Sequence, residues 1–196
     1  MHRRPSKSYR RLQNVKETRK IFLIVCEGEK TEPNYFQKFR VPGSIIDVRG
    51  TGANTDSLVK EAIKLKNKAS YDQVWCVFDR DSFPLLNFNN ALLLAAANNI
   101  SVAYSNEAFE LWYLLHFYYH DSATSRNLYV KMLTIRLGSK YFKNDPDMFD
   151  KLISMQSTAI KHAEKLLSTY PNHSPVSDNP STTVHKLVLQ LAINSA

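Results

Sequence analysis

Residues 21–28 read IFLIVCEG and residues 74–81 read VWCVFDRD, so two apolar runs each end in acidic residues. Unbroken apolar runs with β-branched members are typical of strands that are buried on both faces of a parallel sheet. In an open parallel α/β sheet, functional groups gather at the carboxyl ends of the strands. These two stretches therefore predict a sheet in which Glu27, Asp79 and Asp81 face one crevice.

Strands and helices alternate along the first half of the chain. The apolar patterns predict strands at 21–26, 45–48, 73–78 and 100–104, and helices at 31–40, 55–69 and 87–99. Repeated β-α units of this kind predict an α/β fold. Its parallel sheet is expected to have about four strands, flanked by helices and joined by right-handed crossovers.

From about residue 107 the chain is expected to be mainly helical. Helices are predicted at 107–119, 128–137, 147–154, 157–168 and from about Pro180 or Ser181 onward. Ser105 and Asn106 are good N-cap residues for the first of these helices. Residues 21–196 are interpreted as a single α/β domain that carries this helical extension.

The net charge of +8 is concentrated at the N-terminus. Residues 1–20 hold eight Lys or Arg and one acid, which gives +7, whereas the remaining 176 residues hold 18 basic and 17 acidic side chains. A basic arm with few apolar residues is expected to be flexible and to suit a phosphate backbone. A solubilising leader is the alternative. The residues expected to contact nucleic acid are Arg3, Arg4, Lys7, Arg10 and Arg11.

Composition narrows the class of protein. The apolar fraction of 43% and the charged fraction of 22% are those of an ordinary globular domain. No apolar run approaches the roughly 20 residues that span a bilayer, and no signal-peptide pattern precedes the first strand. We therefore expect a cytoplasmic protein without a membrane partner. Cys26 and Cys76 fall in predicted strands and are expected to be buried thiols.

The acidic strand ends form a candidate metal site. Gathered carboxylates destabilise a fold unless positive charge lies among them, and a hard divalent cation is the usual solution. Asp79 and Asp81 share parity in an extended segment, so their carboxylates point the same way. With Glu27, they could hold one or two Mg²⁺ (or Mn²⁺) ions and activate water against a phosphodiester. Solvated loop acids are the alternative interpretation.

Two further acids and two histidines lie on the expected aromatic helix. Glu107 suits the positive end of the helix dipole, whereas Glu110 lies beside Trp112 and needs a cation or metal partner. His116 and His120 have a spacing that can bind zinc. No Cys or third His accompanies them, so exposed or core-edge histidines are the preferred interpretation.

The last predicted helix begins with the residues NPSTTVHK at 179–186. The hydroxyls of Ser181 and Thr182 at a helix start could bind an anion, and Lys186 could reach a scissile phosphate. Simple capping also explains the hydroxyls. Glu32 and Asn106 complete the set of candidate supporting or phosphate-binding residues.

Four motifs together resemble the RloB-like family. They are LIVCEGEKTEPNYF at 23–36, VWCVFDRD at 74–81, SN at 105–106 with FELW at 109–112, and NPSTTVH at 179–185. The resemblance covers the chain from residue 20 to the C-terminus. It implies a role in prokaryotic anti-phage (abortive-infection) defence, commonly beside an ABC-type ATPase or restriction genes.

The RloB-like family is thought to be similar to Toprim domains, in which Glu-Gly ends the first strand and Asp-x-Asp ends the third. The resemblance thus implies a Toprim-like, Mg²⁺-dependent nuclease for DNA or RNA. Glu27 would be the general acid/base, Asp79 and Asp81 the metal ligands, and Glu110 a further acid of the metal site. Toprim sequences often carry an acid four residues after the Glu, where this chain has Thr31.

Two other classes of function compete with a nuclease. Residues 79–82, DRDS, also resemble the nucleophile motif of haloacid-dehalogenase-like phosphatases, in which the first Asp is phosphorylated. That fold normally carries the motif on its opening strand, whereas a βαβα segment precedes it here. A non-catalytic module that binds nucleic acid or a partner, with a structural cation, is the third hypothesis. The sequence is also compatible with a homo-oligomer.

Overall fold

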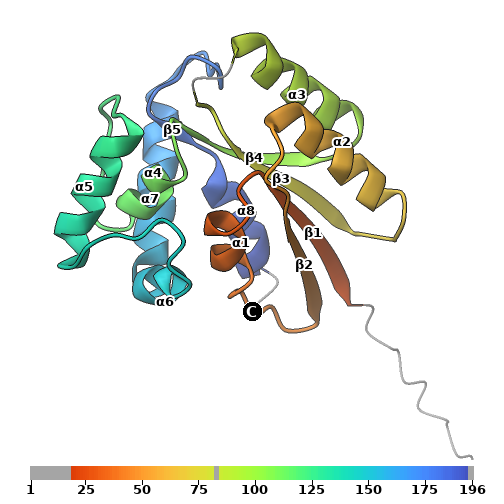
Figure 1. Ribbon diagram of the computed structural model, residues 1–196, viewed down its shortest axis with the longest axis horizontal. Coiled ribbons are helices and arrows are strands. Elements are labelled where there is room, and N and C mark those ends of the chain that lie inside the picture. The colour runs from red at the N-terminus through yellow and green to blue at the C-terminus, as the bar shows by residue number, and fades with distance from the viewer. Residues whose placement is uncertain (1–18, 82–83, 194–196) are drawn as a thin grey trace, which may run out of the picture.

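The computed structural model describes residues 19–81 and 84–193, and it shows one five-stranded sheet with helices on both faces (Figure 1). The strand order is β2-β1-β3-β4-β5, in which the first four strands run parallel and β5 is antiparallel to β4. The strands are β1 (Lys20–Cys26), β2 (Ser44–Gly50), β3 (Gln73–Asp79), β4 (Ser101–Asn106) and β5 (Ser181–Thr182). The predicted α/β class with a mainly parallel sheet is confirmed.

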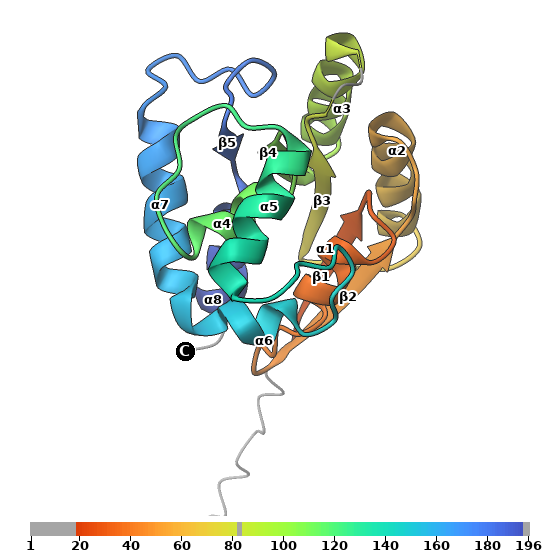
Figure 2. The same cartoon turned by 60° about the vertical axis from the view of Figure 1, so that its left-hand side comes forward.

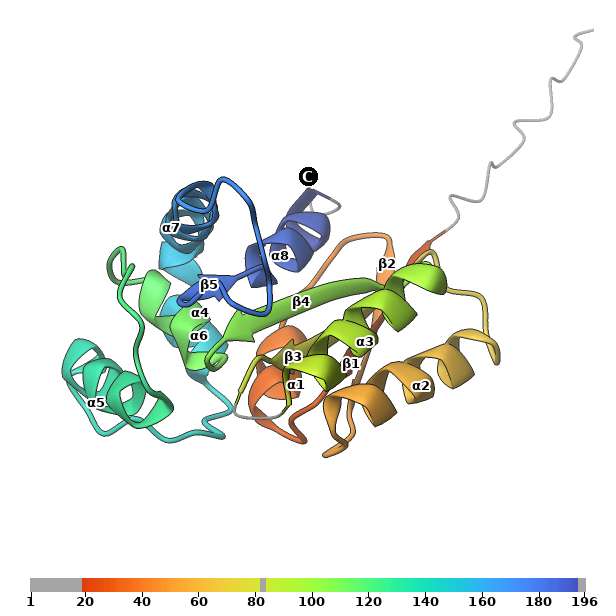
Figure 3. The ribbon, with the colours of Figure 1, turned by 90° about the horizontal axis from the view of Figure 1, so that it is seen from above.

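The side chains of β1 alternate between two separate cores. Leu23 and Val25 pack in one core with the buried residues of α2 (Thr55–Lys66) and α3 (Leu85–Ala97). Figure 3 shows these two helices side by side on one face of the sheet. Because successive strand residues point to opposite faces, a strand buried on both sides has to be apolar throughout.

The opposite core contains Phe22 and Ile24 of β1 together with most of the helical C-terminal half. Figure 2 shows the helices of this half grouped on the side of the sheet away from α2 and α3. They are α4 (Glu110–Leu115), α5 (Arg126–Leu137), α6 (Met148–Leu152), the short 3-10 helix η1 (Ile153–Met155), α7 (Gln156–Ser168) and α8 (Val184–Ile193). Helix α1 (Thr31–Phe36), from the first half of the chain, packs in the same core. The predicted helical half is thus confirmed, and it covers one face of the sheet.

Two predicted helix starts are wrong, and one cause explains both. Ser105 and Asn106 continue β4, because they pair with Thr182 and Ser181 of β5. The helix expected from 107 therefore begins only at Glu110, and the last helix begins after the short strand rather than at Pro180 or Ser181. Ser, Thr and Asn favour helix caps, but here these residues form the β4–β5 pair, whose two strands are distant in sequence.

The remaining differences concern helix lengths. α1 ends at Phe36 and α2 ends at Lys66, a few residues earlier than expected. Both predicted thiols, Cys26 and Cys76, are buried and free. In the part of the chain that the structure describes, none of the helices has the length and apolar character that crossing a bilayer requires. The five residues expected to contact nucleic acid, Arg3, Arg4, Lys7, Arg10 and Arg11, lie outside the described residues.

Candidate functional site

A pocket of about 340 Å³ lies at the carboxyl ends of β1 and β3. The two ends adjoin because Cys26 is in register with Val77, and the amide of Glu27 continues this pairing by donating to the carbonyl of Val77 at 2.9 Å. The pocket is lined by Glu27, Gly28, Glu32, Gly52, Ala53, Asn54, Asp79, Asp81, Arg126 and Lys143. The predicted meeting of Glu27, Asp79 and Asp81 in one crevice is therefore confirmed.

Glu27 connects the two strand ends to α2. Its Oε2 accepts a hydrogen bond from the backbone amide of Asp79 at 3.1 Å, and its Oε1 accepts one from the Thr55 hydroxyl at 3.2 Å. Partial burial raises the pKa of Glu27, while these two hydrogen bonds oppose the rise. The carboxylate is thus held in one orientation at the pocket wall.

Asp79 is paired with a cation from the helical half. Arg126, the first residue of α5, places Nη2 3.1 Å from Asp79 Oδ2 and 4.0 Å from Asp81 Oδ2. The Asp79 side chain is 15% exposed. Its burial, followed by the charges of Glu32 and Glu110, raises the pKa of Asp79 well above its ordinary value, and Arg126 opposes the rise.

Glu32 lies directly over Gly28 at the start of α1. A Cβ on Gly28 would overlap Glu32 Oε2 and would lie 3.0 Å from Cδ, so with any other residue at 28 this carboxylate would have to shift. Glu32 is 6% exposed, and its Oε2 is buried without a hydrogen-bond partner. Burial, followed by the charge of Glu110, raises the pKa of Glu32 to about 7, while Lys143 opposes the rise.

Glu110 is buried and is not part of the pocket lining. The Tyr141 hydroxyl donates to its Oε1 at 3.1 Å. Its charge nevertheless raises the pKa of Asp79 and of Glu32. The Tyr141 hydroxyl is thus the hydrogen-bond partner of this buried acid in the structure, and the metal role of Glu110 stays a prediction.

Three predicted phosphate-binding candidates make hydrogen bonds within the protein. Asn106 Nδ2 and Ser181 Oγ both donate to the carbonyl of Asp178, at 2.9 and 2.7 Å, and Thr182 Oγ1 donates to the carbonyl of Tyr104 at 3.0 Å. All three side chains are buried beside the β4–β5 pair. Asn106 also lines a neighbouring pocket of about 310 Å³ that shares Asp81 with the acidic pocket.

Lys186 and the two histidines also lie outside the acidic pocket. Lys186 is exposed on α8 and is absent from the lining. His116 and His120 are buried rather than exposed. Each has its own partner, because a ring nitrogen of His116 is 2.9 Å from the Trp112 carbonyl and one of His120 is 2.8 Å from the Thr124 hydroxyl. The spacing of the two histidines therefore reflects core packing.

The two cations of the pocket, Arg126 and Lys143, are not among the residues predicted from the sequence. Arg126 stands in the first turn of α5, where the helix dipole disfavours a positive charge, and this was the one available signal. The Lys143 segment is held against α1 because the Thr31 hydroxyl is 2.9 Å from the Lys143 carbonyl and 3.0 Å from Asn144 Oδ1. The helical half thus supplies the positive side of an acidic site.

The donor set suits a hard cation that is held mainly by water and substrate. Among the described residues, no group of three acidic, His or Cys side chains is arranged to hold a metal ion by itself. Mg²⁺, however, is commonly bound by one or two carboxylates and keeps several waters or phosphate oxygens. Asp79 and Asp81 offer such carboxylates. Glu27 and Glu32 line the same pocket, and a bound cation would reduce the repulsion among these negative charges.

The fold and the pocket together define a class: an α/β protein with an acidic pocket at the carboxyl edge of a mainly parallel sheet. The family model described as RloB-like protein matches residues 22–191, so the chain belongs to the RloB-like family. This confirms the resemblance that the motifs indicated. No curated protein and no solved structure matches the chain.

Proposed function

We propose that this protein is a metal-dependent nuclease that hydrolyses a phosphodiester bond of DNA or RNA. The observation that carries the proposal is the meeting of Glu27, Asp79 and Asp81 in one pocket that also contains Arg126 and Lys143. Carboxylates that can hold a divalent cation, next to two side chains that bind phosphate oxygens, match the needs of phosphoryl chemistry. The likeness of the RloB-like family to Toprim domains points the same way.

Asp79 and Asp81 are the proposed metal ligands. A bound Mg²⁺ would supply positive charge for the phosphate oxygens and lower the pKa of a bound water. In the free protein Arg126 provides the positive charge beside Asp79. We propose that Arg126 turns from Asp79 to a phosphate oxygen when a cation occupies the site, because its guanidinium binds phosphate as well as carboxylate.

Glu27 is the proposed general base. Its raised pKa brings it closer to neutrality, where a carboxylate accepts a proton more effectively. Water attacks phosphorus as Glu27 takes its proton, the bond to the leaving oxygen breaks, and protonated Glu27 then gives that proton to the leaving oxygen. Lys143, which also lines the pocket, would neutralise charge on the phosphate during this step.

A role as effector of anti-phage defence, in the cytoplasm and with an ABC-type ATPase partner, is part of the same proposal and rests on the family. The basic arm is proposed to contact the nucleic acid. It joins the sheet at the amino end of β1, opposite the pocket. The 19 residues that precede β1 could span at most about 70 Å if fully extended, which would let the arm contact nucleic acid bound at the other edge.

The test is incubation with labelled DNA and RNA pools plus Mg²⁺ or Mn²⁺, with and without the partner ATPase. Wild type should cut a substrate, whereas Glu27→Gln and Asp81→Asn should not. Glu61→Gln is the matched control, because Glu61 is a surface acid of α2 that pairs with Lys64. Failure of wild type on every substrate, or equal cutting by the Asp81→Asn variant, would contradict the proposal.

A further inference from the structure

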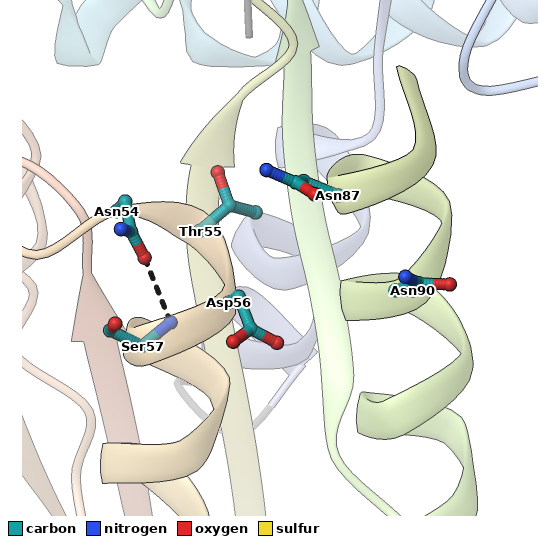
Figure 4. A pocket seen from close by; sticks show the side chains of 6 residues that line it. All are labelled: Asn54, Thr55, Asp56, Ser57, Asn87 and Asn90. Atoms are coloured by element: carbon teal, nitrogen blue, oxygen red, sulfur yellow. Dashed lines mark hydrogen bonds between the residues drawn. The ribbon is translucent and has the colours of Figure 1, made fainter. Parts of the chain in front are cut away.

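A second pocket of about 290 Å³ adjoins the acidic pocket, between the start of α2 and α3 (Figure 4). It is lined by Asn54, Thr55, Asp56, Ser57, Asn87 and Asn90. The two pockets share Asn54, and a hydrogen bond links a lining residue of one pocket to a lining residue of the other. Thr55 lines the second pocket while its hydroxyl donates to Glu27 Oε1 at 3.2 Å. A ligand in the second pocket would therefore lie next to the proposed general base.

The lining of this pocket is polar but carries no Lys or Arg among the described residues. Asp56 adds a negative charge, and its Oδ2 holds Lys60 at 2.6 Å. A phosphate group would meet a carboxylate here without a cation in the lining, so the pocket is unsuited to phosphate even though α2 begins beside it. The lining suits a neutral ligand with several hydrogen-bonding groups.

The amide side chains of this pocket can both donate and accept hydrogen bonds. Asn54 uses its Oδ1 to cap α2 by accepting from the Ser57 amide at 3.1 Å, so its NH₂ group is what it can offer to a ligand. Asn87 extends from α3 toward the start of α2, and Asn90 stands one turn later on the same helix. Within the described part of the chain, neither of these two side chains has a hydrogen-bond partner, and both are exposed.

We propose that this second pocket holds the base of the nucleotide next to the bond that is cut, and that Asn87, Asn90 and Asp56 select that base. Base edges carry neighbouring donors and acceptors, which Asn matches in pairs, and a carboxylate accepts from an exocyclic amino group. The base has to be unpaired to enter, so the substrate is single-stranded or looped nucleic acid. The inference rests on the proposed nuclease function and names its substrate class.

The first test measures binding without cleavage. Fluorescein-labelled single-stranded RNA and DNA decamers of each base are titrated in EDTA and followed by fluorescence polarisation. Wild type should prefer one base by about 5- to 150-fold, the range expected for one good paired contact. Asn87→Ala and Asn90→Ala should lose this preference. Asn89→Ala should keep it, because Asn89 is exposed on the same helix but is not part of the lining.

A second test separates this inference from the nuclease proposal. Cleavage of a randomised single-stranded library should show a base preference beside the cut, and Asn87→Ala should flatten that position alone. If cutting occurs but Asn87→Ala and Asn90→Ala leave the base preference unchanged, the proposed base pocket is refuted and the nuclease proposal is unaffected. If nothing is cut but binding shows a base preference that depends on these residues, the nuclease proposal is refuted and the base-binding pocket is supported.

Inorganic phosphate provides the remaining probe. Side-chain amide signals in ¹H–¹⁵N spectra should shift with the preferred nucleoside and not with phosphate. Comparison of wild type with Asn87→Ala and Asn90→Ala assigns those signals. A response to phosphate alone would overturn the proposal, because it would show that the start of α2 binds an anion.

Discussion

Replacing Gly28 by Ala tests whether the acidic pocket is built around Glu32. The added Cβ would overlap Glu32 Oε2, and it would lie 3.0 Å from Cδ and 3.2 Å from Oε1, all closer than ordinary van der Waals contact. Gly28 is not one of the glycines with a positive φ, so an alanine backbone is not strained there. The expected effect is therefore a steric conflict with a single carboxylate.

The size of the effect follows from how tightly Glu32 is enclosed. Glu32 is 6% exposed, and both its Oε2 and its Cδ would have to shift to admit the new methyl group; overpacking of this kind costs about 1–3 kcal/mol. The alanine also lowers the conformational entropy of the unfolded chain, which stabilises the folded state by about 0.4–1 kcal/mol. We expect Gly28→Ala to lower the free energy of unfolding by about 1–2 kcal/mol in the wild-type background.

The assay is a double-mutant cycle by urea unfolding of four proteins: wild type, Gly28→Ala, Glu32→Ala and the double variant. In the Glu32→Ala background the conflict is gone, so Gly28→Ala should be neutral or slightly stabilising. The coupling between the two sites should then be about 1–3 kcal/mol. Equal destabilisation by Gly28→Ala in both backgrounds would refute the packing of Glu32 over Gly28.

Three further predictions concern the charges of the pocket. The pKa of Glu32 is raised from its ordinary 4.5 to about 7, so the folded state holds a proton that the unfolded state loses. Stability should therefore fall as pH rises from 4.5 to 7, and Glu32→Gln should remove up to about 3 kcal/mol of the loss between pH 5 and pH 8 in urea titrations. Thr55→Val removes a hydrogen bond to the Glu27 carboxylate, so the pKa of Glu27 should rise and the acidic limb of the kcat/KM profile should move to higher pH, whereas Thr55→Ser should restore it. Arg126→Gln leaves Asp79 without its cation, so 10 mM Mg²⁺ should raise the Tm at pH 8 more in this variant than in wild type, and no rise in either protein would count against a metal at Asp79.

Much of the fold follows from short-range patterns. Leu23 and Val25 face one core while Phe22 and Ile24 face the other, and this double burial is what an unbroken apolar run requires. Parallel strands bring their carboxyl ends to one edge, so the meeting of Glu27 with Asp79 could be predicted although 52 residues separate them. The strand end alone positions these groups, and no knowledge of the helical half is needed.

The other half of the site depends on contacts between distant segments. The unfavourable place of Arg126 in a first helix turn does not say which acid it meets, and nothing near Lys143 marks it, because both reach the pocket only after the helical half packs against the sheet. Strand β5 was not predicted either, because it depends on pairing with the distant β4. Its two residues are too few to show the alternation that is typical of a strand.

The sequence by itself determined the sheet, its two cores and the acidic strand ends, because side-chain periodicity and strand direction are local properties of the chain. Only the tertiary structure decided which cations face those acids, that Glu32 lies over Gly28, and that the amide-lined pocket between α2 and α3 opens beside Glu27. These features arise from the packing of elements far apart in sequence. That packing depends on shape complementarity across the whole core, which no single segment contains.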